Sequence, residues 1–205
     1  MVATMSSVIE TMTDTWQTYI DDLARVLAAA SFTGRDGGEL PADVGYARWR
    51  NLTLRVREQR RTVYMIGNGA SASMASHFAA DLAKNGRVHT QTFFDLALIT
   101  AISNDISYEQ VFAEPLRRRG EGGDMLVAIS SSGKSPNILA AAAVAADLGM
   151  TLVTLTGKDP ANPLRGRGDL NLHVPAPTYG LTETAHAAAL HRWMDLVQMA
   201  DGELT

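Results

Sequence analysis

In TVYMIGNGASAS, residues 62–73, an apolar strand runs directly into a glycine- and serine-rich turn, which is the strongest indication of the fold. MLVAISSSGKSPN, residues 125–137, repeats the arrangement, with Pro136 at the start of a helix. Such turns direct free backbone N–H groups and hydroxyls at one point beside the positive end of a helix dipole, where an anion binds. The two turns predict that a phosphorylated small molecule is held at the carboxyl edge of a parallel sheet.

Strands and helices alternate along the chain from Thr62 onward. The strands are expected at 62–66, near 93–98, and at 125–129, 151–155 and 170–174. The helices are expected at 71–84, about 108–119, 136–148 and about 182–200. This alternation predicts an α/β fold with a doubly wound, five-stranded parallel sheet flanked by helices.

Two helices are expected before the first strand, over residues 6–31 and about 41–60, because apolar side chains recur there at helical spacing. They predict a helical hairpin over residues 1–60, outside an α/β core of residues 61–205. The length of 205 residues fits a single domain, 1–205. Trp16 and Trp49 could serve a subunit interface or the core.

Composition excludes several classes of function. The net charge of −4 carries no basic excess and argues against nucleic acid as a partner. The absence of cysteine excludes disulfides, thiolate catalysis and cysteine-based zinc sites. No apolar run reaches the ~18 residues that span a bilayer, and the first 20 residues do not resemble a signal peptide. These features predict a cytoplasmic protein with no membrane partner.

Nucleotide-binding motifs fit the two turns poorly. The first turn formally matches a dinucleotide fingerprint, through Gly67, Gly69 and Ala72, but three serines after a later strand are foreign to that fold. The second turn ends like a P-loop, yet Ala128 stands where the first P-loop glycine belongs. We therefore expect no nucleotide cofactor. The hydroxyls of Ser130, Ser131, Ser132 and Ser135 exceed what capping one helix requires and favour phosphate binding.

Acidic and imidazole side chains share faces on two predicted helices. His77 and Asp81 are four residues apart on the helix after the first turn. Glu183, His186 and His191 lie on the terminal helix, with Glu183 and His191 about 80° apart around its axis. The spacing alone is compatible with a metal or catalytic site, and equally with an i,i+4 pair and a helix-start acid.

Taken together, the motifs resemble a known family, the sugar isomerase (SIS) domain of sedoheptulose-7-phosphate isomerases, also called phosphoheptose isomerases. The resemblance covers nearly the whole chain and implies a homotetramer whose sites are shared between subunits. It rests on Gly67–Ser71 with His77–Leu82, Thr100–Asp105 with Tyr108 and Val111-Phe112, Gly123–Asn137, and Leu155–Gly157.

The resemblance also implies roles for individual residues. Asp81 and His191 match the acid and the histidine that move a proton between adjacent sugar carbons. His77, Asp81, Glu183 and His191 match the residues that hold a zinc ion in some members. The substrate contacts fall on the first turn, the following asparagine-aspartate pair, the serine turn and the last helix: Asn68, Gly69, Ala70, Ser71, Asn104, Asp105, Ser130, Ser131, Ser132, Ser135 and Glu183.

Four departures from the family pattern bear on the substrate. Asp81 is one methylene shorter than the usual glutamate, and Glu183 replaces a glutamine. Lys134 replaces an asparagine in the serine turn, and Lys158-Asp159-Pro160 replaces a Gly-Gly pair. We predict an aldose–ketose isomerase of a phosphorylated sugar, with sedoheptulose 7-phosphate as the first choice. The alternatives are a non-catalytic SIS protein that binds a sugar phosphate or acts as a regulator, an isomerase of another phosphosugar, and a nucleotide-dependent oxidoreductase.

Overall fold

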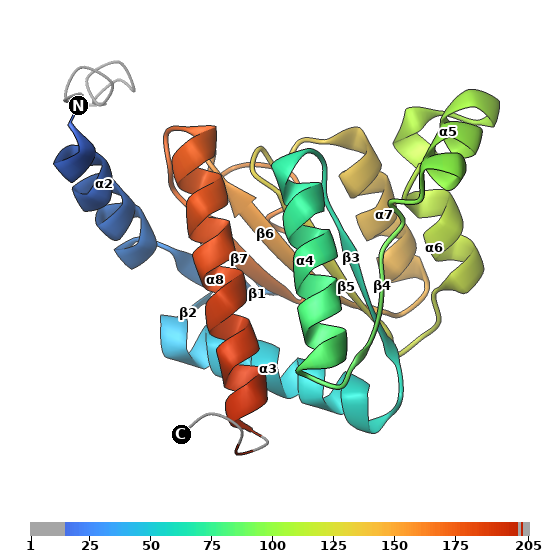
Figure 1. Ribbon diagram of the computed structural model, residues 1–205, viewed down its shortest axis with the longest axis horizontal. Coiled ribbons are helices and arrows are strands. Elements are labelled where there is room, and N and C mark those ends of the chain that lie inside the picture. Colours follow the sequence, from blue (N-terminus) through green and yellow to red (C-terminus); the bar gives the residue numbers. More distant parts are fainter. Residues whose placement is uncertain (1–14, 201, 203–205) are drawn as a thin grey trace.

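A seven-stranded sheet in the order β2-β1-β7-β6-β5-β3-β4 forms the centre of the computed structural model, which describes residues 15–200 and residue 202 (Figure 1). Strands β3 to β7 run parallel, whereas β1 pairs antiparallel with both β2 and β7. The strands are β1 Ser31–Gly34, β2 Glu39–Leu40, β3 Thr62–Ile66, β4 His89–Gln91, β5 Met125–Ser130, β6 Thr151–Gly157 and β7 Leu170–Val174.

Helices cover both faces of this sheet. One apolar cluster joins the sheet to α3, α4 and α8, and a second joins the opposite face to α5, α6 and α7. The helices are α2 Trp16–Ala28, α3 Ala42–Glu58, α4 Ala70–Lys84, α5 Leu96–Asp105, α6 Ala113–Arg119, α7 Pro136–Asp147 and α8 Tyr179–Met199, with a 3₁₀ turn η1 at Tyr108–Gln110. The predicted doubly wound α/β architecture is confirmed.

The direction of winding reverses between β3 and β5, which are neighbours in the sheet. From β3 the chain crosses to β4 through α4 on one face, and from β5 it crosses to β6 through α7 on the other. The carboxyl ends of two such strands leave a crevice between them, where open α/β sheets bind ligands. Both predicted anion-binding turns, 67–70 and 130–135, leave the sheet at this crevice.

The amino-terminal part differs from the predicted helical hairpin. β1 and β2 separate α2 from α3, both helices contact α8, and the sheet gains two strands beyond the predicted five. The reason is the edge of β7, whose backbone groups pair with β1, while Phe32 lies buried against Gly45 of α3. With only four residues, β1 is too short for its sequence to show the alternation of apolar and polar residues that predicts a strand. Residues 6–14 of the first predicted helix lie outside the described residues.

The strand predicted near 93–98 is wrong. The paired strand is β4 at His89–Gln91, and α5 begins at Leu96. Asp95 caps that helix, because its carboxylate accepts a hydrogen bond from the Leu98 N–H at 2.9 Å. The helix predicted at 108–119 is divided into η1 and α6.

Two stacked indole rings tie α3 to α8. The ring centroids of Trp49 and Trp193 lie 4.4 Å apart at 9°, and both side chains are fully buried. The Trp193 Nε1–H donates to the Thr53 hydroxyl at 3.0 Å. Trp49 therefore belongs to the core, whereas Trp16 is 74% exposed. In the described part of the chain, no helix combines the length and apolar character needed to cross a membrane.

Candidate active site

The first turn is shaped by glycines at the carboxyl end of β3. Gly69 has a φ of +56° and precedes α4, a backbone conformation that a side chain would strain. A Cβ at Gly67 would lie 2.5 Å from the backbone of Ser71, so the chain can only close this tightly with glycine there. The expectation of free N–H groups here is not met, because the Ser71 and Ala72 N–H groups donate to the Asn68 and Gly69 carbonyls at 3.0 Å.

A pair of amides joins this turn to the start of α7. Asn68 and Asn137 exchange two hydrogen bonds of 2.9 Å through their side chains. The Ile138 N–H donates to the Asn137 oxygen, which fixes that amide's orientation and, through it, the orientation of Asn68. The Tyr108 hydroxyl donates to the Asn68 oxygen at 3.2 Å. The predicted substrate contact Asn68 is thus held by two elements, α7 and η1.

The serine turn presents hydroxyls rather than a helix cap. Ser130 Oγ accepts from the Gly133 N–H, and Ser132 Oγ accepts from the Lys134 N–H, each at 3.2 Å. A hydroxyl that accepts a backbone bond keeps its own hydrogen for a further acceptor. Ser131 Oγ is buried and has no hydrogen-bond partner among the described residues. Two available hydrogens and one unpartnered hydroxyl fit an anionic ligand.

Ser135 stands at the start of α7 without capping it through its side chain. Ser135 occupies the N-cap position and Pro136 follows it, but the Ser135 side chain makes no capping bond to the described helix. Its Oγ lies 3.4 Å from Ser130 Oγ instead. The short side chain is directed back into the turn, which adds another hydroxyl to the same cluster.

Two of the predicted site histidines meet across α4 and α8, two helices that contact each other, and the predicted acid lies beside one of them. His77 Nε2 lies 3.3 Å from Asp81 Oδ2, and the rings of His77 and His191 have centroids 6.0 Å apart. Phe78 sets both rings edge-on, with centroids 4.9 Å from His77 and 4.7 Å from His191. Asp81 is one-third exposed, so its carboxylate is open to a substrate. This arrangement can pass a proton between a carboxylate and an imidazole.

The four-ligand zinc set is not supported. Among the described residues, no group of three or more histidine or acidic side chains is arranged to hold a metal ion. Glu183 lies eight residues before His191, which is about 12 Å along the axis of α8. The set therefore does not converge within one chain, and no step of a reaction is assigned to a metal.

His186 is buried and serves the core. Its Nε2 lies 3.0 Å from the Thr156 carbonyl, and burial lowers its pKa to about 4. His173 on β7 is also buried, and burial, followed by the positive charge of Arg165, lowers its pKa to about 4. Both rings are therefore neutral at pH 7. Because both are buried, we assign neither of them a role in acid–base catalysis.

Asn104 and Asp105 end α5, and both are exposed. The Asn104 amide donates to the Asp105 carboxylate at 2.9 Å. A cavity of about 230 Å³ lies between α5 and α6, and Asp105 is the one predicted site residue that lines it. The bond from Tyr108 to Asn68 brings this segment to the first turn, which supports the two residues as part of the same site.

Two residues that position this site were not identified from the sequence. Asn137 and Tyr108 belong to the stretches that carry the family resemblance, but neither was assigned a role. Both act on Asn68 by hydrogen bonds that join residues 40 and 69 positions apart in the sequence. One signal for them was present in the sequence: Tyr108 closely follows Asn104 and Asp105, and Asn137 closely follows the serine turn.

The predicted site residues form two clusters within one chain. The turns and Asn68 lie at the carboxyl edge of the sheet, whereas Asp81 lies about 16 Å further along α4 and His191 about 18 Å along α8. Within one chain, then, the anion-binding turns and the acid–imidazole pair are well separated.

Comparisons with known proteins agree with this fold. The SIS domain family matches residues 50–157. A phosphoheptose isomerase of Coxiella burnetii is 38% identical over 139 residues, which cover 64% of this chain and 70% of that protein.

Two solved structures match nearly the whole length. The phosphoheptose isomerase from Neisseria gonorrhoeae has a TM-score of 0.77 at 25% identity, covering 95% of this chain and 99% of that one. A phosphoheptose isomerase from Francisella tularensis has a TM-score of 0.77 at 26% identity, covering 96% of this chain and 100% of that one.

Proposed function

This chain belongs to the SIS-domain family of phosphoheptose isomerases, and from that premise we propose that it interconverts sedoheptulose 7-phosphate and an aldoheptose 7-phosphate. The observation that carries the proposal is the position of His77 between the two proposed groups: it lies 3.3 Å from Asp81 on α4, and its ring faces that of His191 on α8. An aldose–ketose isomerisation needs one base and one acid near adjacent carbons. It involves no net oxidation, so it needs no nucleotide cofactor.

In the proposed reaction the two turns hold the sugar by its phosphate. The hydroxyls of the serine turn donate to the phosphate oxygens, and the positive end of the α4 dipole adds attraction for the anion. Binding energy gained at this end positions the carbonyl end for reaction. Asn68 contacts the sugar, with its orientation fixed by Asn137 and Tyr108.

The proton moves from C1 to C2 of the ketose. Asp81 accepts the C1 proton while His191 donates a proton to the C2 oxygen, which gives an enediol. Asp81 then returns a proton to C2 as the C1 oxygen gives its proton to His191, and the aldehyde forms. The position of His77 beside both Asp81 and His191 supports this division of roles.

The assembly belongs to the proposal as well. We infer a homotetramer with shared sites, in which the acid–imidazole pair of one subunit works beside the turns of another. The separation of the two clusters along α4 and α8 supports sharing. Exposed apolar side chains at Trp16, Ile20 and Leu96 are suited to subunit contacts. We place the enzyme in the cytoplasm, where phosphorylated sugars are processed.

Zinc stays a prediction of the resemblance. A partner subunit would have to bring Glu183 to the His77, Asp81 and His191 group for the four ligands to meet. Metal analysis of the purified protein tests this point separately from the reaction.

The decisive experiment measures turnover of sedoheptulose 7-phosphate together with deuterium incorporation from D₂O at C2 of the aldose. Asp81→Asn and His191→Gln are each expected to lower kcat by about 10²- to 10⁴-fold. His89→Gln is the matched control, because His89 is an exposed histidine at the start of β4, the amino end of the parallel strands. Full activity in Asp81→Asn would refute the mechanism.

The same assay separates the proposal from its alternatives. Binding of the sugar phosphate with no turnover and no exchange would identify a receptor rather than an enzyme. Turnover of a shorter phosphosugar in preference to the heptose would keep the mechanism and change the substrate, as the short Asp81 side chain and the acidic Glu183 allow.

A further inference from the structure

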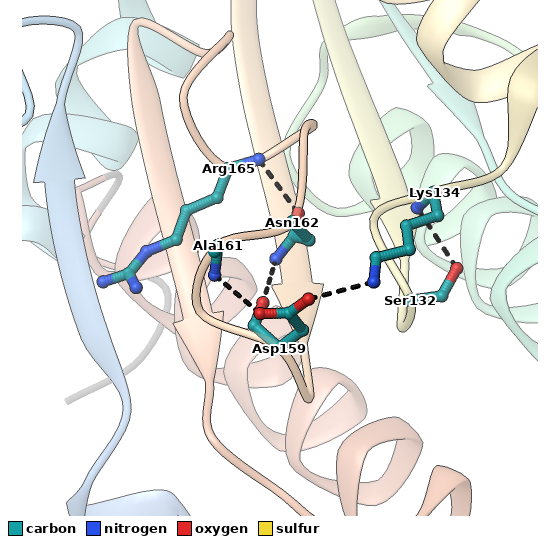
Figure 2. A network of polar contacts seen from close by, with 6 residues as sticks. All are labelled: Ser132, Lys134, Asp159, Ala161, Asn162 and Arg165. Atoms are coloured by element: carbon teal, nitrogen blue, oxygen red, sulfur yellow. Dashed lines mark hydrogen bonds and ion pairs between the residues drawn. The ribbon is translucent and has the colours of Figure 1, made fainter.

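The segment after β6, residues 158–165, lies against the serine turn. The Lys134 ammonium lies 2.9 Å from Asp159 Oδ2, and this ion pair joins the two loops (Figure 2). The backbone adds two bonds, from Gly157 N–H to the Ser131 carbonyl at 3.1 Å and from Leu164 N–H to the Gly133 carbonyl at 3.2 Å. The turn predicted to bind phosphate therefore has a carboxylate fastened beside it.

Asp159 is held in place independently of Lys134. Its Oδ1 accepts from the Ala161 N–H at 2.9 Å, and its carbonyl accepts from the Asn162 side chain at 2.7 Å. Asn162 is buried, and its oxygen accepts from the Arg165 N–H at 3.1 Å (Figure 2). The carboxylate thus has a fixed position, which it keeps when the lysine leaves.

Lys134 is the movable partner. Its backbone N–H is bonded to Ser132 Oγ, which fixes its Cα within the turn. Its side chain is 59% exposed and ends a flexible four-carbon stem. Exposed lysine–carboxylate pairs are weak, so the ammonium is free to exchange one anion for a better one.

Two anions can compete for this ammonium. A phosphate monoester carries about −1.5 to −2 charges at pH 7, more than a carboxylate, and has three acceptor oxygens. The neighbouring Lys134 ammonium, and then the hydrogen bond from Ala161, hold the pKa of the Asp159 carboxyl below its usual range. Asp159 is therefore charged at neutral pH, and it both occupies Lys134 and repels an incoming phosphate.

We propose that Lys134 is a specificity-determining residue that transfers from Asp159 to the substrate phosphate when the serine turn is filled, and that Asp159 weakens anion binding. The inference rests on the proposed function of the serine turn as the phosphate site. It gives the site a selection rule: only a ligand whose phosphate outcompetes Asp159 recruits the lysine. An unphosphorylated sugar leaves the ion pair intact.

The test is the sign of the effect of Asp159→Asn on phosphate affinity. Asparagine keeps the oxygen that accepts from Ala161 and removes only the charge. Inorganic phosphate is titrated by calorimetry into the wild type, Asp159→Asn, Lys134→Met and the double variant. We expect Asp159→Asn to tighten phosphate binding about threefold to tenfold and Lys134→Met to weaken it by a similar factor. In the Lys134→Met background, Asp159→Asn should have less than half of its effect on log Kd.

Glu121→Gln is the matched control. Glu121 is an exposed carboxylate paired with Arg61 at 2.6 Å, and it precedes β5, at the opposite edge of the sheet. Its loss removes the same charge without touching the turn, so phosphate affinity should stay within twofold of the wild type.

Two outcomes overturn the inference alone. Weaker phosphate binding in Asp159→Asn would show that the ion pair only braces the loop. Equal effects of Asp159→Asn with and without Lys134 would show that the Asp159 charge simply repels phosphate and does not compete with it for the lysine. Phosphate binding that Ser132→Ala and Lys134→Met both leave unchanged would refute the phosphate site itself. The turnover assay of Asp81→Asn is independent of all of these.

Discussion

His186 makes the stability of the fold sensitive to acid. Its Nε2 donates to the Thr156 carbonyl, and its pKa is lowered to about 4 by burial, against an ordinary value near 6.5. The unfolded chain therefore binds a proton from about pH 6.5 downward, whereas the folded chain does so only near pH 4. The stability is fully present above pH 6.5 and is lost as the pH falls toward 4.

We predict that this histidine costs the wild type about 2 kcal/mol of unfolding free energy between pH 7 and pH 5. His186→Gln keeps a donor for the Thr156 carbonyl and removes the titration. Urea unfolding measures the decrease in unfolding free energy from pH 7 to pH 5. We expect this decrease to be smaller by about 2 kcal/mol in His186→Gln than in the wild type, and equal to that of the wild type in the exposed control His89→Gln. Parallel losses in all three proteins would contradict the prediction.

Two features exclude a side chain at Gly133, its left-handed backbone and the neighbouring Asn162 side chain. The φ of Gly133 is +61°, and a Cβ there would lie 1.9 Å from Asn162 Oδ1. Gly149 has a φ of +70°, and no atom lies within 4 Å of the position that a Cβ would take there. The two residues share the strain of a left-handed backbone and differ in the space around it.

Gly133→Ala is accordingly predicted to destabilise the fold by about 1–3 kcal/mol more than Gly149→Ala. It should also weaken phosphate binding, because Asn162 must move and take the serine turn with it. Denaturant unfolding measures the first effect and calorimetry the second. Equal destabilisation by the two alanine substitutions would mean that the Asn162 side chain moves aside without loss of stability.

Among the elements, η1 holds the first turn through one hydroxyl. Tyr108 is 58% exposed, yet its Oη donates to Asn68 at 3.2 Å. Tyr179 is exposed to nearly the same degree, and its ring lies over Lys158, a contact that a phenylalanine keeps. The two tyrosines therefore form a matched pair for removal of a hydroxyl.

Tyr108→Phe should lower kcat/KM for the sugar phosphate by about threefold to tenfold and leave the unfolding free energy within about 0.5 kcal/mol. The reason is a lost constraint on the orientation of Asn68, with no buried surface changed. Tyr179→Phe should leave both quantities unaltered. Steady-state kinetics and urea unfolding decide the point, and a fall in stability that matches the fall in activity would argue for a structural role of Tyr108.

The elements that sequence could predict are those with long, self-consistent patterns. β3 and β7 begin and end where the sequence places them, and α4, α7 and α8 lie within three residues of their predicted starts. β1, β2 and α5 could not be predicted, because their formation depends on the edge of β7 and on the Asp95 cap. The meeting of His77 with His191 needed the packing of α4 on α8, which local periodicity does not contain.

At the scale of the whole molecule, the separation of the two clusters has a functional consequence. Asp81 lies about 16 Å along α4 from the first turn, and the serine turn lies at that same carboxyl edge. If each site combines the turns of one subunit with the acid–imidazole pair of another, two differently damaged chains can repair each other.

We predict complementation between Asp81→Asn and the double variant Ser130→Ala with Ser132→Ala. Each protein alone should be nearly inactive, since one lacks the base and the other the hydroxyls that bind phosphate. Random mixing of the chains by co-expression should restore about a quarter of the wild-type sites, because only one pairing in four has both parts intact.

Isomerase activity per tetramer, measured on mixtures separated by two affinity tags, checks this value. Co-expression of Asp81→Asn with His191→Gln is the control, because both changes damage the same α4–α8 pair and no combination restores it. If the first mixture has no more activity than the mean of its parents while the tetramer is intact, each subunit completes its own site. The two clusters would then have to approach each other through a movement of α4 and α8 within one chain.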